Sequence, residues 1–214
     1  MTMQTIGQFL SIEGIEGAGK TTVVQFIREF LESHNVNVYF TREPGGTPLA
    51  EKIRDLLLHS HDDVLQMTTE LLLMFAARAE HLAACIKPRL QQGQWVVTDR
   101  FIDASYAYQA GGRGLSERFI QVLDQFVVGS CYPQLTLLLD LPPELGLQRA
   151  KSRGNHPDRI ERERVDFFER VRQTYLARYA ADPTRIHLIN ASLPLPDVLK
   201  QVENALTIFM AKFT

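Results

Sequence analysis

Apolar positions along the chain follow two spacings, and their alternation predicts strands separated by helices. Short apolar runs predict five strands, at residues 9–12, 36–40, 95–98, 135–139 and 186–189. Apolar residues at the spacing of one helical face predict helices after Thr22, at 49–59, 69–92, 144–152 and 161–181, and from 196 or 197 to 213. A further predicted helix ends at Gly129 and has on one side Phe119, Val122, Leu123, Phe126 and Val127. This alternation is typical of an α/β fold with a parallel sheet and right-handed crossovers. No internal repeat interrupts it, so we expect one domain over residues 1–214.

The first predicted strand runs into a glycine-rich loop that fits the P-loop pattern G-x-x-x-x-G-K-[ST]. The loop and the residue after it are Gly14, Ile15, Glu16, Gly17, Ala18, Gly19, Lys20, Thr21 and Thr22. The glycines allow backbone N–H groups to face one anion, Lys20 offers positive charge to terminal phosphates, and the Thr21 hydroxyl suits Mg²⁺. The alternative, a chance glycine-rich turn, is disfavoured by the order strand, loop, helix. The loop predicts a nucleoside triphosphate with magnesium as the ligand, but it leaves the reaction open.

Two charged pairs directly follow other predicted strands: Arg42-Glu43 after the second and Asp99-Arg100 after the third. Ligands of parallel α/β sheets gather beyond the carboxyl ends of the strands, so we expect both pairs to meet the P-loop around one cleft. Asp99 there is suited to the magnesium shell, and Arg100 to a two-pronged contact with a second phosphate. A surface ion pair is the less favoured alternative for Asp99-Arg100.

Phe75 and Arg78 lie three residues apart on a predicted helix and so share one face. An aromatic ring beside a guanidinium group suits a planar base, which Phe75 can stack on and Arg78 can bind at an edge carbonyl. Phe75 also fits an apolar stripe of the same helix, so core packing is an equal alternative. Met67 and Met74 are most simply core residues.

A charged segment near the end of the chain carries four basic residues, Arg149, Lys151, Arg153 and Arg159, around the loop at 154–157. Such a loop could close as a lid, at about residues 149–161, over a triphosphate, while a solvated charged face is an equal alternative. Two histidines at 59 and 61 have no third ligand at usable spacing, which favours a polar helix end over a metal site.

The bulk properties indicate a soluble globular protein. Of the 214 residues, 45% are hydrophobic and 22% charged, and the net charge of −2 gives no reason to expect nucleic acid or a membrane as partner. Cys85 and Cys131 are the only cysteines and lack metal-type spacing, as in a reducing compartment. We find neither a signal-peptide pattern nor an apolar run long enough to span a bilayer, so we expect a cytoplasmic protein.

Several long segments together resemble the thymidylate kinases, specifically the bacterial kind. They are FLSIEGIEGAGKTT (9–22), TREPGGTPLAEKIRDLLL (41–58), LLLMFAARAEH (71–81), TDRFIDASYAYQAGGRGL (98–115) and SRGNHPDRIERERVDFFERVRQTYL (152–176). The resemblance runs nearly from end to end. It implies a P-loop NTPase fold of the nucleoside monophosphate kinase type, with a five-stranded parallel sheet flanked by helices. It also implies transfer of the γ-phosphoryl group of ATP to dTMP with Mg²⁺, and a homodimer built on helix faces.

The resemblance implies roles for residues around the thymine base. Phe75 matches the aromatic residue that stacks on thymine, and Arg78 matches the partner of the base carbonyl. Ser105 and Gln109 match positions that line the base pocket. Tyr108 matches a tyrosine near the sugar 2′ carbon, where it disfavours a ribose hydroxyl.

The resemblance also implies roles around the sugar and the acceptor phosphate. Glu16 matches the P-loop acid near the 3′-hydroxyl, and Arg54 and Arg100 match clamps on the phosphate. Glu43-Pro44 matches the segment that shapes the acceptor site, to which we also assign Leu58.

The catalytic arginine is expected from the lid. Some thymidylate kinases carry an arginine within the P-loop, but this chain has Gly17 there. Similar bacterial enzymes supply it from the lid, which points to Arg153, with Arg149 and Arg159 in support at the ATP site. Catalysis is therefore assigned to Lys20, Arg100 and Arg153.

Three other functions are alternatives to this one. The first is another pyrimidine nucleotide or deoxynucleoside kinase of the same fold. The second is a nucleotide switch, for which we find neither D-x-x-G after a strand nor N-K-x-D. The third is a nucleic-acid-dependent ATPase, which the slightly acidic charge balance disfavours.

Overall fold

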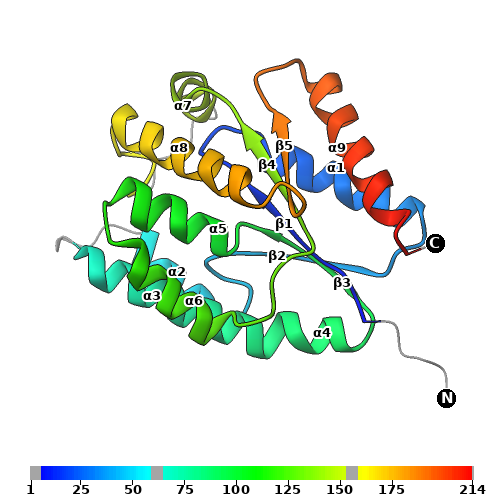
Figure 1. Ribbon diagram of the computed structural model, residues 1–214, viewed down its shortest axis with the longest axis horizontal. Coiled ribbons are helices and arrows are strands. Elements are labelled where there is room, and N and C mark those ends of the chain that lie inside the picture. The colour runs from blue at the N-terminus through cyan, green and yellow to red at the C-terminus, as the bar shows by residue number, and fades with distance from the viewer. Residues whose placement is uncertain (1–5, 59–64, 153–158, 214) are drawn as a thin grey trace.

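The computed structural model describes residues 6–58, 65–152 and 159–213. Within them, five strands form one parallel sheet in the order β2-β3-β1-β4-β5, which confirms the predicted fold class (Figure 1). The strands are β1 (Phe9–Glu13), β2 (Val38–Arg42), β3 (Trp95–Asp99), β4 (Leu135–Asp140) and β5 (Ile186–Asn190). Strands β1 and β4 are buried along nearly all their length, as expected when helices cover both faces of a sheet.

Helices cover both faces of this sheet. In the described residues they are α1 (Lys20–Ser33), α2 (Pro48–Leu58), α3 (Met67–His81), α4 (Lys87–Gln91), α5 (Ile102–Ser105), α6 (Glu117–Val127), α7 (Pro143–Lys151), α8 (Val165–Ala181) and α9 (Leu195–Met210). Two π-helical segments, η1 (Leu82–Ile86) and η2 (Tyr106–Gly112), join α3 to α4 and extend α5. Helices α1 and α9 lie together on one side of the sheet, and α3, α4, α6 and α8 lie on the other (Figure 1).

Some boundaries differ from those predicted. Strand β2 begins at Val38 instead of residue 36, because the N–H of Val36 donates to the Leu31 carbonyl at 3.0 Å and closes the end of α1. The strand begins where Val38 lies opposite Trp95 of β3. The helix predicted from residue 161 begins at Val165. These shifts leave the order of the elements unchanged.

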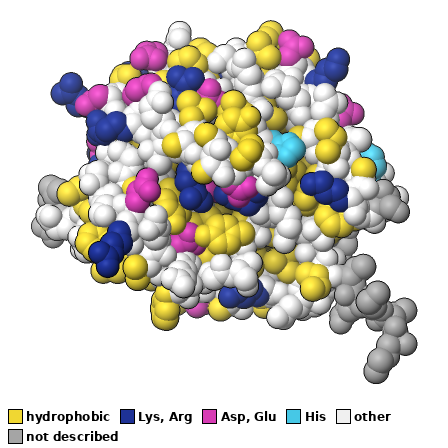
Figure 2. All heavy atoms as spheres, viewed as in Figure 1, with side chains coloured by type: hydrophobic (Ala, Val, Ile, Leu, Met, Phe, Trp, Pro, Cys, Tyr) yellow, Lys and Arg dark blue, Asp and Glu magenta, His cyan; other side chains and the backbone are white. Residues whose placement is uncertain are grey.

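The surface mixes charge with apolar side chains. On the face shown in Figure 2, Lys and Arg side chains are interspersed with Asp and Glu. None of the helices in the described ranges has both the length and the apolar character needed to cross a bilayer.

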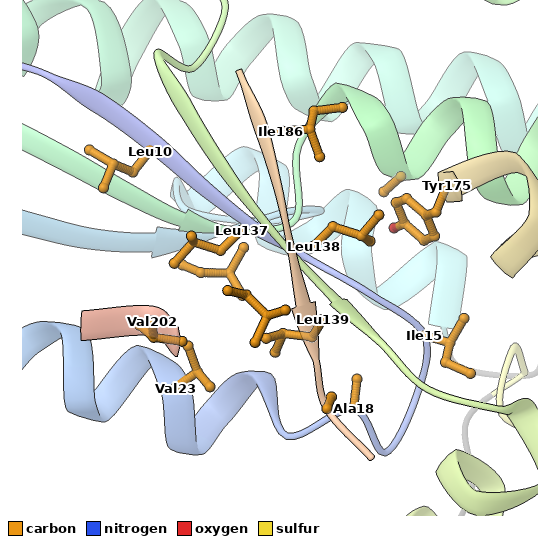
Figure 3. Close-up of a cluster of buried hydrophobic side chains, with 14 of the residues drawn as sticks. Leu10, Ile15, Ala18, Val23, Leu137, Leu138, Leu139, Tyr175, Ile186 and Val202 are labelled. Atoms are coloured by element: carbon orange, nitrogen blue, oxygen red, sulfur yellow. The ribbon is translucent and has the colours of Figure 1, made fainter. Parts of the chain in front are cut away.

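Successive side chains of β4 point alternately to the two faces of the sheet. Figure 3 shows Leu137 and Leu139 on the side of Val23 from α1 and Val202 from α9, while Leu138 lies on the side of Tyr175 from α8. A second buried cluster lies under α3, α4 and α6, and its members include Phe9, Leu71, Phe75, Phe101 and Ile120. The sheet therefore has a packed apolar layer on each face.

The carboxyl ends of three strands lie level with one another. Ile12 of β1 and Arg42 of β2 both pair with Asp99 of β3. Beyond them, the N–H of Arg100 donates to the Ile12 carbonyl and the N–H of Glu43 to the Asp99 carbonyl, each at 2.9 Å. The P-loop and the two charged pairs therefore meet at one edge of the sheet.

Candidate active site

A cavity of about 750 Å³ lies at this edge of the sheet. It is lined by the predicted site residues Glu16, Gly17, Gly19, Lys20, Thr21, Thr22, Glu43, Pro44, Arg54, Leu58, Asp99, Arg100, Tyr108, Gln109, Arg149 and Arg159. Six other predicted residues are buried and do not line it: Gly14, Ile15, Ala18, Phe75, Arg78 and Ser105. Arg153 and the two histidines at 59 and 61 lie outside the described residues.

Two glycines of the P-loop, Gly17 and Gly19, are required for different reasons. A Cβ on Gly17, which has φ of 73°, would lie 1.9 Å from the carbonyl oxygen of Gly146. A Cβ on Gly19, which has φ of 90°, would meet no atom within 4 Å. Gly17 therefore permits the close approach of α7, whereas Gly19 leaves open the cavity floor where a phosphate would approach the backbone.

Lys20, the first residue of α1, folds back over the loop that precedes it. Its Nζ donates to the carbonyls of Gly14 at 3.0 Å and Ile15 at 3.1 Å. Burial, and then the positive charge of Arg100, lower the pKa of Lys20 to about 8. The ammonium group is therefore mostly protonated at neutral pH, but its pKa lies only slightly above that pH.

This pKa predicts a decline in ATP use at alkaline pH. Lys20 loses its charge as the pH rises through about 8, so kcat/KM for ATP should then fall. The fall should approach tenfold per further pH unit, measured in steady-state assays at saturating dTMP. Burial and the negative charge of Asp103 raise the pKa of Glu13 to about 8 as well, so Lys20→Ala is the control. If its residual activity shows the same decline, another group is responsible.

Arg100 connects the end of β3 to the P-loop. Its guanidinium donates to the Gly14 carbonyl at 2.9 Å and to Glu16 Oε1 at 2.7 Å. The other carboxylate oxygen of Glu16 accepts from the Tyr108 hydroxyl at 2.7 Å, and Arg100 Cζ lies 4.8 Å from the Tyr108 ring centroid. Arg100 has φ of 69°, an unusual value for a residue with a side chain. The surrounding packing therefore holds the Arg100 backbone in a strained conformation, and such strained residues are concentrated at functional sites.

Glu13 supports this arrangement from below and was missed by the sequence reasoning. Its side chain is buried; Oε1 accepts from the N–H of Phe101 at 2.8 Å and Oε2 from the Tyr175 hydroxyl at 2.7 Å. An acidic residue at the end of a mostly apolar strand was the available signal, because buried acids need partners.

Asp99 and Thr21 offer oxygen atoms to a cation. Both line the cavity, and the buried Oδ1 of Asp99 has no hydrogen-bond partner within the described part of the chain. The same ranges hold no cluster of three or more His, Cys, Asp or Glu side chains able to enclose a metal alone. This donor set fits Mg²⁺, which usually takes one or two protein oxygens and completes its shell with water and phosphate.

Glu43 organises the part of the cavity beyond β2. Its two carboxylate oxygens accept from Arg78 Nε at 2.7 Å and contact His81 Nδ1 at 3.0 Å. Burial alone would lower the pKa of His81, but hydrogen bonds with Cys85 and Glu43 raise it to about 9. A Cβ on Gly46 would lie 2.4 Å from His81 Nε2, so only glycine admits this histidine.

The helix face that meets the cavity differs from the one expected. Phe75 is 2% exposed and packs in the second buried cluster, where its ring centroid lies 4.9 Å from Arg78 Cζ. Arg78 and Ser105 also lie behind the cavity wall, joined by a 2.8 Å hydrogen bond from Arg78 Nη1. Met74, expected as core, lines the cavity instead, and Met67, also expected as core, is 48% exposed.

Two basic residues of the predicted lid, Arg149 and Arg159, line the cavity. Arg149 donates to the Ala191 carbonyl at 2.8 Å, after β5. Arg159 donates to the Leu57 carbonyl at 3.0 Å and to the buried carboxylate of Glu70. Glu70 lines the cavity and was missed by the sequence reasoning, although it lies four residues before Met74 and eight before Arg78 on one helix face. The other cavity residues that were not assigned roles are Arg42, Leu57, Ala104, Ile160 and Glu161.

A parallel sheet with a P-loop, an acid beyond the neighbouring strand and arginines facing one cavity defines the class of P-loop nucleotide-binding kinases. A model of the thymidylate kinase family matches residues 12–202. The chain is 53% identical to a thymidylate kinase of Pseudomonas savastanoi pv. phaseolicola, over 94% of this chain and 95% of that protein. It is 52% identical to one of Alkalilimnicola ehrlichii, over 94% and 93%.

The fold agrees with these comparisons. The crystal structure of a thymidylate kinase from Ehrlichia chaffeensis matches with a TM-score of 0.76 and 33% identity, covering 94% of this chain and 98% of that one. The chain belongs to the thymidylate kinase family, as its sequence motifs predicted.

Proposed function

We propose that this kinase transfers the γ-phosphoryl group of ATP to dTMP, giving ADP and dTDP, with the ATP phosphates at the P-loop. The observation that carries the proposal is one cavity lined by the P-loop on one side and by Glu43, Arg54 and Arg100 on the other. The acceptor is a phosphate oxyanion, whose second pKa of about 6 leaves it largely dianionic near neutral pH. It needs no general base, so alignment and neutralisation of charge perform the catalysis.

The two ends of the cavity divide these tasks. Lys20 and the backbone around Gly19 hold the donor phosphates. Thr21 and Asp99 would hold Mg²⁺, which would neutralise charge on the phosphates. Arg100 and Arg54 grip the acceptor phosphate. Arg54 Nη1 donates to the Pro44 carbonyl at 2.8 Å, which holds its guanidinium at the acceptor side. Arg149 flanks the ATP side, whereas Arg159, which the sequence assigns to the ATP site, pairs with Glu70 at the base side.

A coupled assay of ADP release tests this function. We expect turnover with dTMP and ATP to exceed turnover with dCMP, dGMP, dAMP and thymidine by orders of magnitude. Preference for another monophosphate or for a nucleoside would support another kinase of the same fold, the alternative that the family membership does not favour. ATP hydrolysis unaffected by any acceptor would refute phosphoryl transfer.

The base lies, in this proposal, against the helix segment that runs from Met74 to Arg78. Met74 is the apolar side chain of this segment that lines the cavity, and a thioether packs well on a planar ring. Phe75, expected to stack on thymine, lies behind it and supports Arg78 from within the core.

Replacing Met74 and Phe75 separately distinguishes the two side chains. Met74→Ala removes the cavity contact, so KM for dTMP should rise by about tenfold, the loss of roughly 1–2 kcal/mol of packing. Phe75→Leu perturbs the buried cluster, so Tm should fall while KM for dTMP stays close to that of the wild type. Calorimetry and steady-state kinetics measure both. The reverse pattern would return the stacking role to Phe75.

We further propose a homodimer that works in the cytoplasm without nucleic acid. Three of the apolar residues predicted to share one side of α6, Phe119, Val122 and Phe126, are 60%, 60% and 86% exposed. The other two, Leu123 and Val127, pack against the second buried cluster. Leu72 of α3 is 53% exposed. Apolar faces of this kind are typical of subunit contacts. Two free cysteines, Cys85 and Cys131, suit a reducing compartment.

Sedimentation equilibrium tests the dimer. The wild type should have twice the mass of one chain, and Phe126→Asp, which places a charge on the apolar face, should shift the population to single chains. A matched change on the exposed polar surface, Glu203→Asp in α9, should leave the mass unchanged. A wild-type mass equal to one chain at micromolar concentration would contradict the proposal.

A further inference from the structure

Glu70 is a buried charged residue to which neither the motifs nor the proposed reaction assigns a role. It lies in the first turn of α3, lines the cavity and is 1% exposed. Its carboxylate accepts from Gln109 Nε2 at 2.9 Å, from Arg113 Nε at 3.3 Å and from Arg159 Nη2. It therefore joins the base side of the cavity, through Gln109, to a lid arginine.

The hydrogen bond from Gln109 determines which way its amide points. A glutamine amide has a donor end and an acceptor end, whereas an ionised carboxylate only accepts. Glu70 can therefore bind only the Nε2 end of Gln109, because the reverse orientation would bring two oxygens together. The other end of the amide, Gln109 Oε1, is buried and has no hydrogen-bond partner in the described ranges, although Gln109 lines the cavity.

The charges around Glu70 keep it ionised. Burial alone would raise the pKa of Glu70, but Arg113, the hydrogen bond from Gln109 and the charge of Arg159 together lower it. The carboxylate therefore remains a pure acceptor over the pH range in which dTMP is a dianion.

We propose that Glu70 is a positioning residue for base specificity: by binding the Nε2 end of Gln109, it presents Gln109 Oε1 to the base as a fixed hydrogen-bond acceptor. This proposal rests on the proposed function, in which the base lies beside Gln109. A fixed acceptor pairs with the ring N3–H of thymine or uracil. It faces the N3 lone pair of cytosine, which leaves a buried oxygen unpaired and costs binding. Glu70 thus helps to select pyrimidines that carry a ring N–H.

Glu70→Gln is the direct test, because glutamine has nearly the same shape but can donate as well as accept. Gln109 can then turn over, so the ratio of kcat/KM for dCMP to that for dTMP should rise by about tenfold or more, the loss of one hydrogen-bond preference. A purely structural role would lower kcat/KM for both substrates by the same factor. An unchanged ratio would overturn the proposal.

Two control variants separate this inference from the proposed function. Gln109→Ala should raise the same ratio, and Glu70→Gln should add nothing in that background, because no amide remains to be oriented. If Gln109→Ala leaves the ratio unchanged, the base does not lie beside Gln109 and the proposed placement fails. If Gln109→Ala raises the ratio while Glu70→Gln does not, the positioning role of Glu70 is refuted, but the placement of the base beside Gln109 stands.

Folding is monitored by circular dichroism. If Glu70→Gln does not fold, the matched pair Glu70→Asp and Glu70→Asn takes its place, because the two side chains differ only in carboxylate against amide. We expect the asparagine variant to show the higher ratio of dCMP to dTMP use, and equal ratios would overturn the proposal.

Discussion

Replacing Arg153 with alanine is expected to lower kcat by about 10³-fold or more, the range of a catalytic arginine in phosphoryl transfer. The KM for dTMP should remain nearly unchanged, because this residue is assigned to the transferring phosphoryl group. Arg153 lies outside the described residues, so the assignment rests on the sequence and on the P-loop. Gly17 cannot be replaced by arginine there, since any Cβ would collide with the Gly146 carbonyl at 1.9 Å.

Neighbouring basic residues provide the comparison for Arg153. Lys151→Ala removes an exposed charge at the end of α7 and should leave kcat within a few-fold of the wild type. Arg149→Ala should mainly raise KM for ATP. Single-turnover kinetics with saturating ATP and dTMP would separate the chemical step from product release. A wild-type rate for Arg153→Ala, or a loss shared equally with Lys151→Ala, would contradict the assignment.

Replacing Arg100 with alanine should have the second large effect, on both substrates and on stability. The change removes a hydrogen-bond donor to the acceptor phosphate. Loss of one such donor typically lowers kcat by about 10²–10³-fold. It also leaves the Glu16 carboxylate without its ion pair in the cavity wall and frees Tyr108 from the contact with the guanidinium. We expect kcat/KM for dTMP to fall by at least this factor and Tm to fall as well.

Arg100→Lys is the control that separates charge from geometry. Lysine keeps the positive charge but cannot reach the Gly14 carbonyl and Glu16 with two parallel donors. We expect it to recover part of the stability and little of kcat. Full recovery of kcat by lysine would show that charge alone matters and would refute the two-pronged contact with phosphate.

Features local in sequence were predicted well. The five strands follow from apolar runs such as 135–139, and the P-loop follows from Gly14 to Thr21, because backbone conformation there depends on neighbouring residues. The meeting of Asp99 and Arg100 with the P-loop was also predicted, since parallel strands place their carboxyl ends together. Contacts between segments far apart in the sequence could be predicted where the topology of a parallel sheet brings those segments together.

The orientation of helix faces could not be predicted to the residue. Met74 and Phe75 are adjacent, so about 100° of rotation on α3 separates them, and both fit an apolar face. The position of α2, α6 and the sheet around α3 decides that Met74 meets the cavity and Phe75 the core. The same limit applies to α6, where periodicity put Phe119 and Phe126 on one side but could not say that this side is exposed in the single chain.

By itself, the sequence determined the order of strands and helices, the phosphate-binding loop and the family, because each depends on residues close together in the chain. Only the tertiary structure decided the partners of the buried acidic side chains. Glu13, Glu43 and Glu70 each bind groups far away in the sequence, such as Tyr175, Arg78 and Gln109. A buried carboxyl group must find hydrogen-bond partners wherever packing brings them, and no pattern of spacing records which partners those are.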